Sequence, residues 1–133
     1  LSTECYKKER YSYLYIKVKY MSEEKLYDLE QLDSIAAGNP DFVTKMVNMF
    51  LDMTPGLVDR IEAGLQTQDW AEVRSAAHKM KPSVDMMGIS SLRDVVRRIE
   101  GNAKSETNLE QIPELYFTLT ETLDKVYEQL RNR

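Results

Sequence analysis

The stretch that decides the fold is DWAEVRSAAHKMKPSVDMMGISSLRDVVRRIEGNA, residues 69–103. Apolar residues recur at intervals of three and four on both sides of Gly88, which predicts two amphipathic helices. The inward stripes are Val73, Ala77, Met80, Val84 and Met87 before the glycine, and Ile89, Leu92, Val96, Ile99 and Ala103 after it. Asp69 can cap the first helix, with Glu72 in a capping-box-like position, and Ser90 or Ser91 can begin the second. The very short connection predicts an antiparallel pair.

Three more amphipathic segments surround this pair. A short helix is expected before the stop signal Gly38-Asn39-Pro40, with the stripe Leu26, Leu29, Leu32, Ile35 and Ala36. A long, bent helix is expected around Pro55, with the stripe Val43, Met46, Phe50, Met53, Leu57, Ile61 and Leu65. The polar residues 101–108 precede a last helix with the stripe Ile112, Tyr116, Leu119, Leu123, Val126 and Leu130. The sequence therefore predicts an all-α fold, an antiparallel up-down-up-down four-helix bundle with a short additional N-terminal helix across one end.

Composition describes one ordinary globular domain of 133 residues, with 42% hydrophobic and 30% charged residues and no internal repeat. The single cysteine, Cys5, cannot form an internal disulfide, which favours a reducing, cytoplasmic setting. No apolar run approaches the roughly 20 residues that a membrane span requires, so we expect no membrane contact. The net charge of -4 argues against binding to nucleic acid, because the phosphate backbone requires a basic face.

Residues 1–20 differ from the rest of the chain. They carry a net positive charge, whereas the whole chain is acidic. Residues 11–20 alternate between apolar and polar side chains as a strand does. A lone strand before an all-helical chain has no sheet to join. We expect residues 1–20 to be a leader, a linker or an expression remnant, and residues 21–133 to form the bundle domain. A docking or dimerising strand is the alternative.

His78 is the only histidine. At 100° per residue it lies about 140° from Val73, whereas the rest of its helix's apolar stripe stays within about 40°, so His78 is expected to face solvent. Arg74 and Lys81 lie one turn away on the same side and place two cations near the imidazole. Pro82 lacks the N–H that would bond the carbonyl of residue 78. This irregularity either marks a functional site or is a tolerated kink near a helix end.

Glu100 is expected opposite His78. His78 lies ten residues before Gly88, so its level on an antiparallel partner lies about ten residues after it. A carboxylate that accepts the Nδ1 proton would leave Nε2 free to attack. The alternative is that Glu100 is a solvated surface carboxylate. Lys104, one turn further, adds positive charge near the same place.

Several classes of site are excluded by what the sequence lacks. GxGxxG, GxxxxGK[ST], CxxC and HExxH are all absent. One histidine without a paired Glu-x-x-His motif cannot build a carboxylate-bridged metal centre, and the seven methionines fall largely on the apolar stripes as core filler. A serine nucleophile on a bundle helix would still need an oxyanion hole and a pocket. We therefore expect no metal site and no hydrolytic active site.

The segment AHKMKPSVDMMG, residues 77–88, resembles the signature H-x-x-K-G-S-x-x-x-x-G of histidine phosphotransfer (HPt) domains. The matching places are occupied by His78, Lys81, Ser83 and Gly88. The likeness also covers the helix order from about Leu26 to the C-terminus. Glu100 and Lys104 stand where the family commonly has Glu or Gln and a basic residue. Pro82 replaces the usual small Gly, which bears on how closely a partner can approach.

The resemblance implies a phosphorelay module whose exposed histidine accepts a phosphoryl group from a receiver-domain aspartate and passes it to another receiver. It implies that His78 is the phosphoacceptor, that Lys81 steadies the phosphoryl charge, that Glu100 orients the ring and that Ser83 contributes a hydrogen bond. The expected partner-docking residues are Arg74, Lys79, Pro82 and Lys104. Among the variants His78→Gln, Lys81→Ala and Glu100→Ala, the last is expected to have the mildest effect.

The implied partners are receiver domains of response regulators and a hybrid histidine kinase. The module has no ATP site and no cofactor of its own, because Mg²⁺ and most of the catalytic groups belong to the receiver. It is therefore not an enzyme in its own right, and we expect a monomer. Whether it is a separate protein or part of a hybrid kinase stays open. The alternative function is a non-phosphorylated helical adaptor that docks a receiver or another signalling protein.

Overall fold

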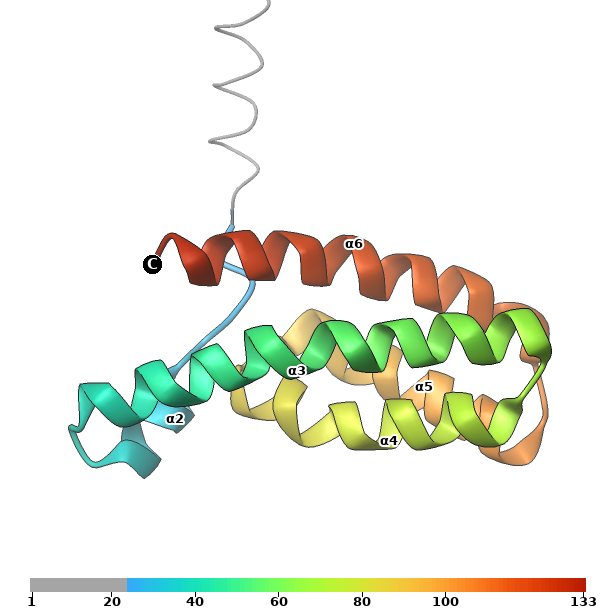
Figure 1. Ribbon diagram of the computed structural model, residues 1–133, viewed down its shortest axis with the longest axis horizontal. Coiled ribbons are helices and arrows are strands. Elements are labelled where there is room, and N and C mark those ends of the chain that lie inside the picture. Colours follow the sequence, from blue (N-terminus) through green and yellow to red (C-terminus); the bar gives the residue numbers. More distant parts are fainter. Residues whose placement is uncertain (1–23) are drawn as a thin grey trace, which may run out of the picture.

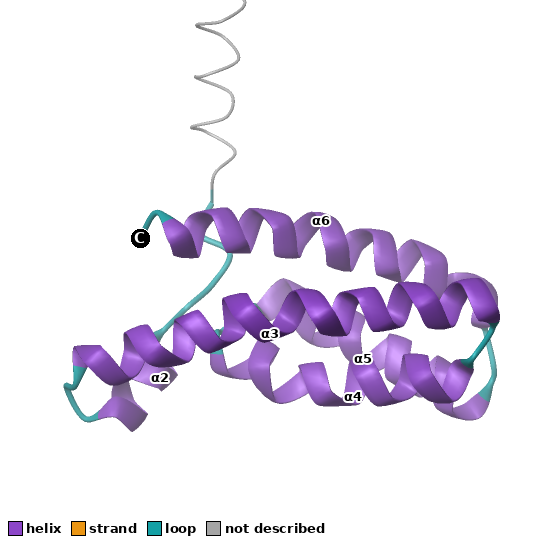
Figure 2. Ribbon diagram, in the orientation of Figure 1, coloured by secondary structure: helices purple, strands orange, loops and turns teal. Residues whose placement is uncertain are grey.

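The computed structural model describes residues 24–133, which form helices and connecting turns without any strand. The elements in chain order are α2 (Glu30–Ala36), α3 (Pro40–Thr67), α4 (Trp70–Met86), α5 (Ser90–Ser105), the 3-10 turn η1 (Leu109–Gln111) and α6 (Ile112–Arg131). Figure 1 shows α3 and α4 side by side, with α6 along the opposite side of α3 and α2 at one end. Figure 2 shows that short turns join the long helices. The expected four-helix bundle with an additional short N-terminal helix is confirmed.

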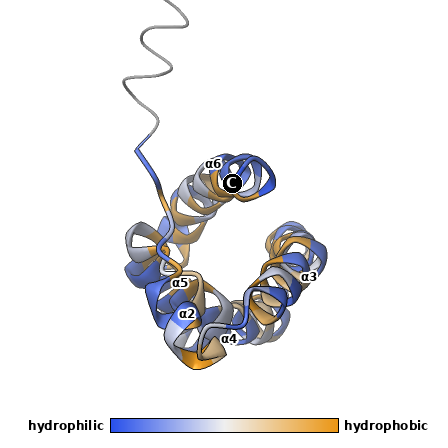
Figure 3. Cartoon of the chain, turned by 90° about the vertical axis from the view of Figure 1, so that its left-hand side faces the viewer, coloured by the Kyte–Doolittle hydropathy of each residue, from blue (hydrophilic) through white to orange (hydrophobic). Residues whose placement is uncertain are grey.

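The four long helices surround one core. Each packs against its neighbours in the order α3, α4, α5, α6, and α6 closes the ring against α3. Figure 3 looks along the bundle and shows the hydrophobic faces turned inward, with α2 over the end of the α4–α5 pair. The stripes expected for α4 and α5 are buried at every position. Burial of these apolar faces is the main force that holds the helices together.

The helix ends follow local chemistry. Asn39 caps α3 by accepting from the N–H groups of Asp41 and Phe42, with Pro40 in the first turn. Asp69 caps α4 by accepting from the N–H of Glu72, but the carboxylate of Glu72 binds Arg60 of α3 and does not complete a capping box. Helix α3 continues through Pro55 as one helix, as expected.

Gly88 ends α4 in a left-handed conformation, with φ of 61°. Any side chain at this position would collide with the backbone of Asp28, whose N–H donates to the carbonyl of Met87 over 3.0 Å. Gln129 of α6 holds the preceding residues by accepting from the N–H of Leu26 over 2.9 Å and donating to the carbonyl of Glu24 over 2.8 Å. The segment before α2 therefore ties the end of α6 to the α4–α5 turn, and Gly88 makes room for it.

Some expectations were wrong in detail. Ile35 and Met53, both assigned to inward stripes, are 54% and 62% exposed. Thr54, next to Met53, is buried instead, because helix periodicity locates a stripe only to within one position when neighbouring residues compete for it. Helix α2 begins at Glu30, after Leu26 and Leu29, and α5 extends to Ser105 into the polar stretch expected as a connection. The leader predicted for residues 1–20, with Cys5, lies outside the described residues.

None of the helices in residues 24–133 combines the length and apolarity that a membrane span requires.

Candidate functional site

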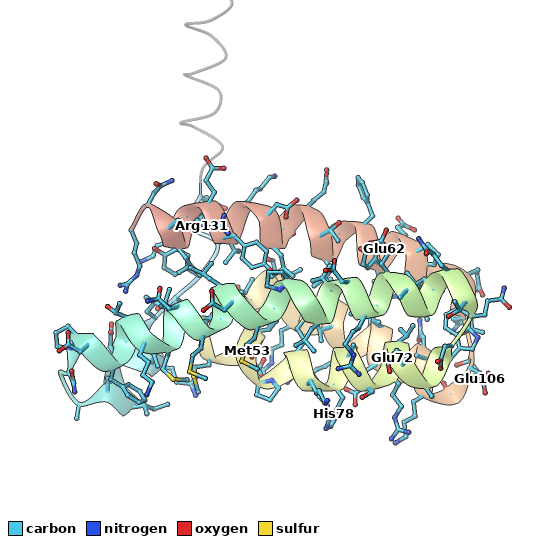
Figure 4. The ribbon with its side chains drawn as sticks, in the orientation of Figure 1. Met53, Glu62, Glu72, His78, Glu106 and Arg131 are labelled. Carbon is cyan, nitrogen blue, oxygen red and sulfur yellow. The ribbon has the colours of Figure 1, made fainter. Side chains whose placement is uncertain are left out.

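His78 lies on the outer side of α4, with 66% of its side chain exposed. Figure 4 shows the imidazole projecting from α4 away from the bundle. It emerges between buried Ala77 and Met80 because its position falls off the inward stripe, as helical arithmetic predicted. The ring is therefore held by the core-packed helix and remains open to a partner.

Glu100 of α5 meets the ring from the side. Its Oε1 lies 2.7 Å from His78 Nδ1, so the expected opposition of these residues across the antiparallel pair is correct. The side chain of Glu100 is only 15% exposed, because it lies in the seam between the helices. An ionised carboxylate can only accept a hydrogen bond, so the Nδ1 atom carries the proton and donates it. In the neutral ring, Nε2 then keeps its lone pair and faces solvent.

Lys81 completes a three-residue network. Its Nζ lies 2.7 Å from Glu100 Oε2, so the two oxygens of one carboxylate serve two different partners. Burial raises the pKa of Glu100, but the hydrogen bonds from Lys81 and His78 outweigh burial, and the pKa lies below its ordinary value. Glu100 is consequently ionised near neutral pH. Lys81 acts on the ring through Glu100 rather than by contact with the imidazole.

A second cross-helix network lies one turn further along the same seam. Arg97 of α5 donates to both carboxylate oxygens of Asp85 in α4, over 2.7 and 3.2 Å, and Arg93 lies 3.8 Å from the same carboxylate. The hydrogen bonds from Arg97 hold the pKa of Asp85 below its ordinary range. The sequence pattern did not reveal this pair, because counting from Gly88 places Asp85 level with residues 91–93 of α5 and Arg97 reaches it from one turn further along that helix. The pair fixes the register of α4 against α5 and hence the approach of Glu100 to the ring.

Ser83 is not brought to the imidazole. It follows His78 by five positions, which turns it about 140° around the helix, toward α3. Its carbonyl accepts from the N–H of Met87 over 3.0 Å, and its hydroxyl makes no hydrogen bond within residues 24–133. The hydrogen bond expected from Ser83 at the site therefore has no geometric support.

The four residues expected to dock a partner are all exposed: Arg74, Lys79 and Pro82 on α4, and Lys104 on α5. Arg74 lies one turn before His78 and Lys104 lies one turn after Glu100, so the two cations stand at the same end of the site. Neither forms an ion pair with any residue of the described range. Pro82 does not end α4, which continues to Met86. In residues 24–133 no cluster of His, Cys, Asp and Glu could hold a metal ion.

Residues 45–133 match the family model of the Hpt domain. The chain belongs to the Hpt domain family. Hpt domains are histidine phosphotransfer modules of phosphorelays rather than enzymes with an ATP site, and this is the function of the chain.

A solved structure supports the fold of this Hpt domain. The crystal structure of the HPT domain from an Hpt sensor hybrid histidine kinase of Shewanella superposes with a TM-score of 0.70. The likeness covers 81% of this chain and 92% of that one, at 22% sequence identity. No curated protein matches the chain.

Proposed function

We propose that His78 Nε2 is the atom that accepts a phosphoryl group from an aspartyl phosphate of a receiver domain and passes it to the aspartate of another receiver. The observation that carries this proposal is the hydrogen bond between His78 Nδ1 and Glu100 on a ring that is 66% exposed. It combines a fixed tautomer with an accessible nucleophile. This is what an exposed histidine needs to attack phosphorus.

The transfer step balances without an additional proton acceptor. The Nε2 lone pair forms the N–P bond while the P–O bond to the donor carboxylate breaks, and the bonding electrons leave with that carboxylate. The ring retains its Nδ1 proton and gains positive charge, which the ionised Glu100 stabilises at 2.7 Å. The reverse sequence passes the phosphoryl group to the next carboxylate. Glu100 thus favours transfer to His78, because it stabilises the charge that the ring gains.

Lys81 has a supporting role in this scheme. Its ammonium group neutralises part of the charge of Glu100 and fixes the second oxygen, so Oε1 stays aimed at the ring. With 27% of its side chain exposed, it also adds positive charge at the edge of the site, where the phosphoryl oxygens arrive.

The partner face surrounds the ring. Arg74, Lys79 and Lys104 supply unpaired or exposed positive charge that favours an acidic, phosphorylated partner, and Pro82 contributes a rigid apolar contact beside it. The proposal places Mg²⁺ on the receiver and no cofactor on this chain. It also retains, as predictions, a monomer that works in the cytoplasm and a hybrid histidine kinase among its partners.

The test is transfer of labelled phosphate from a panel of phosphorylated receiver domains to the wild type and to His78→Gln. Labelling must be read without acid treatment, because phosphohistidine is labile to acid. Labelling that requires His78 supports the relay. An intact fold that no receiver labels would instead favour the docking adaptor without phosphotransfer.

A further inference from the structure

Three of the five glycines have an evident role in the fold. Gly38 and Gly88 adopt positive φ angles of 83° and 61°. A Cβ at Gly64 would come within 2.6 Å of Val73 Cγ2, so this glycine lets α3 and α4 approach closely. Neither a positive φ angle nor a close helix approach explains Gly56 and Gly101. Both lie inside helices and are exposed, and a Cβ at either position would meet nothing within 4 Å.

Glycine in a helix interior destabilises the helix relative to alanine, because it loses more backbone freedom on folding. At Gly56 the cost adds to that of Pro55, its neighbour within α3. Alanine would fit at Gly56 and Gly101 without a clash, so the folded domain does not explain their presence. Local choices that oppose stability tend to occur at functional positions.

Gly56 lies at the level of His78 across the α3–α4 seam. Arg60 Nη2 donates to Ser75 Oγ over 3.3 Å, which sets the register of these antiparallel helices. One turn toward the N-terminus of α3 is Gly56, and one turn toward the C-terminus of α4 is Lys79, the neighbour of His78. Gly56 therefore lies on the exposed face of α3 at about the level of His78, across from Lys79.

Gly101 lies on the other side, next to Glu100 in α5. Glu100 meets both His78 and Lys81, so Gly101 falls within about one helical turn of the level of His78. It points to solvent, because it lies about 160° from buried Ile99 around α5. The two helices that flank α4 thus each carry an exposed glycine at about the level of His78.

We propose that Gly56 and Gly101 are specificity-determining positions. Because they carry no side chain, they leave the surfaces of α3 and α5 near His78 clear, so that a protein partner can bring its phosphoryl group to Nε2. The inference rests on the proposed function. An aspartate side chain is short, so a partner that carries phosphate on it must bring its own backbone close to the ring. Side chains at positions 56 and 101 would hold that backbone too far from the ring for in-line transfer.

The test compares two donors on Gly56→Leu and Gly101→Leu. The first donor is a phosphorylated receiver domain that labels the wild type, and the second is phosphoramidate, a small donor that needs no clearance. Thr118→Leu is the matched control, because Thr118 is an exposed residue of α6, which packs against α3 and α5. We expect each glycine variant to lose at least about tenfold in the rate of labelling by the receiver, equivalent to about 1.4 kcal/mol. Labelling by phosphoramidate and the control should match the wild type.

The alanine variants give a second readout. Gly56→Ala and Gly101→Ala should raise the melting temperature by a few degrees, because alanine favours the helix. A lower melting temperature would mean that the fold requires the glycines, and the inference would be wrong. Leucine variants that accept phosphate from the receiver at the wild-type rate, or that slow equally with both donors, would also overturn it while leaving the proposed function intact. A wild type that phosphoramidate labels but no receiver labels would overturn the proposed function and this inference together.

Discussion

The α4–α5 seam and the α3–α6 seam are both antiparallel helix contacts of one bundle, yet their chemistry is opposite. Across α4–α5 the carboxylates of Glu100 and Asp85 bind cations and have lowered pKa values. Across α3–α6 the rings of Phe50 and Tyr127 pack with their centroids 5.9 Å apart. Burial, reinforced by Asp124, raises the pKa of Tyr127, and its hydroxyl has no hydrogen-bond partner in residues 24–133.

The difference shows that the backbone arrangement alone does not make a phosphotransfer site. The same helix geometry supports an exposed nucleophile, His78, at the α4–α5 seam and a contact between aromatic rings at the α3–α6 seam. The seam with paired charges can stabilise positive charge on a ring and attract an anionic group, because its carboxylates remain ionised. The aromatic seam contributes stability, and changes there should leave transfer unaffected.

The sharpest contrast concerns the nucleophile. His78→Gln should abolish labelling by a phosphorylated receiver, since an amide nitrogen is no nucleophile at neutral pH. Tyr116→Phe in the α3–α6 seam should leave labelling unchanged. The measurement is the rate of phosphate transfer at equal protein concentration, with circular dichroism to confirm folding. Labelling that persists in the glutamine variant would show that another residue accepts the phosphoryl group.

The next largest effect is expected at Glu100. Glu100→Ala should slow transfer by roughly tenfold to a hundredfold, because the ring loses both its tautomer control and its counter-charge. Lys81→Ala should have a smaller effect, since it acts through Glu100. The geometry thus reverses the order expected from the sequence, in which Glu100 was the mildest. Glu62→Ala, which removes a carboxylate beside Tyr116, is the control, and a Lys81 variant slower than the Glu100 variant would restore the earlier order.

Acid should weaken the α4–α5 seam more than the aromatic α3–α6 seam. The folded pKa values of Asp85 and Glu100 lie below their ordinary values of about 4, so their contribution is complete above that range and is lost as the pH falls through the lowered values. The loss should be about 1 kcal/mol at most, because solvent screens both pairs. Urea unfolding at pH 7 and pH 3 measures it. The variant Asp85→Asn with Glu100→Gln should lose less stability than the wild type between these pH values; an equal loss would place the acid sensitivity elsewhere.

The smallest effect at neutral pH is expected at Tyr127. Tyr127→Phe removes a buried hydroxyl without a partner and should change the free energy of unfolding by less than about 1 kcal/mol at pH 7. Above pH 10 the two proteins should diverge. The folded pKa of Tyr127 is raised, so its contribution is complete below the ordinary value of about 10 and is lost as the pH rises through the folded value. Asp85→Asn should follow the wild-type alkaline curve, and a phenylalanine variant that does so too would contradict the assignment.

The bundle and its nucleophile could be predicted from local pattern. Period-3.6 stripes located the long helices, and the short turn at Gly88 fixed α4 and α5 as antiparallel, which was enough to set Glu100 opposite His78. Ser83 and Met53 could not be placed as reliably. A signature match does not say which way a side chain turns, and an apolar residue beside a stripe is buried or exposed according to which neighbour fills the core.

The sequence by itself determined the helical order, the exposure of His78 and its opposition to Glu100, because these follow from helix periodicity and chain connectivity over short separations. Only the tertiary structure decided that Lys81 binds the second oxygen of Glu100, that Asp85 pairs with Arg97, and that Gly56 of α3 lies at about the level of His78. These contacts depend on the packing of α3, α4 and α5 and on the rotamers that it leaves open. A one-dimensional pattern does not contain that information.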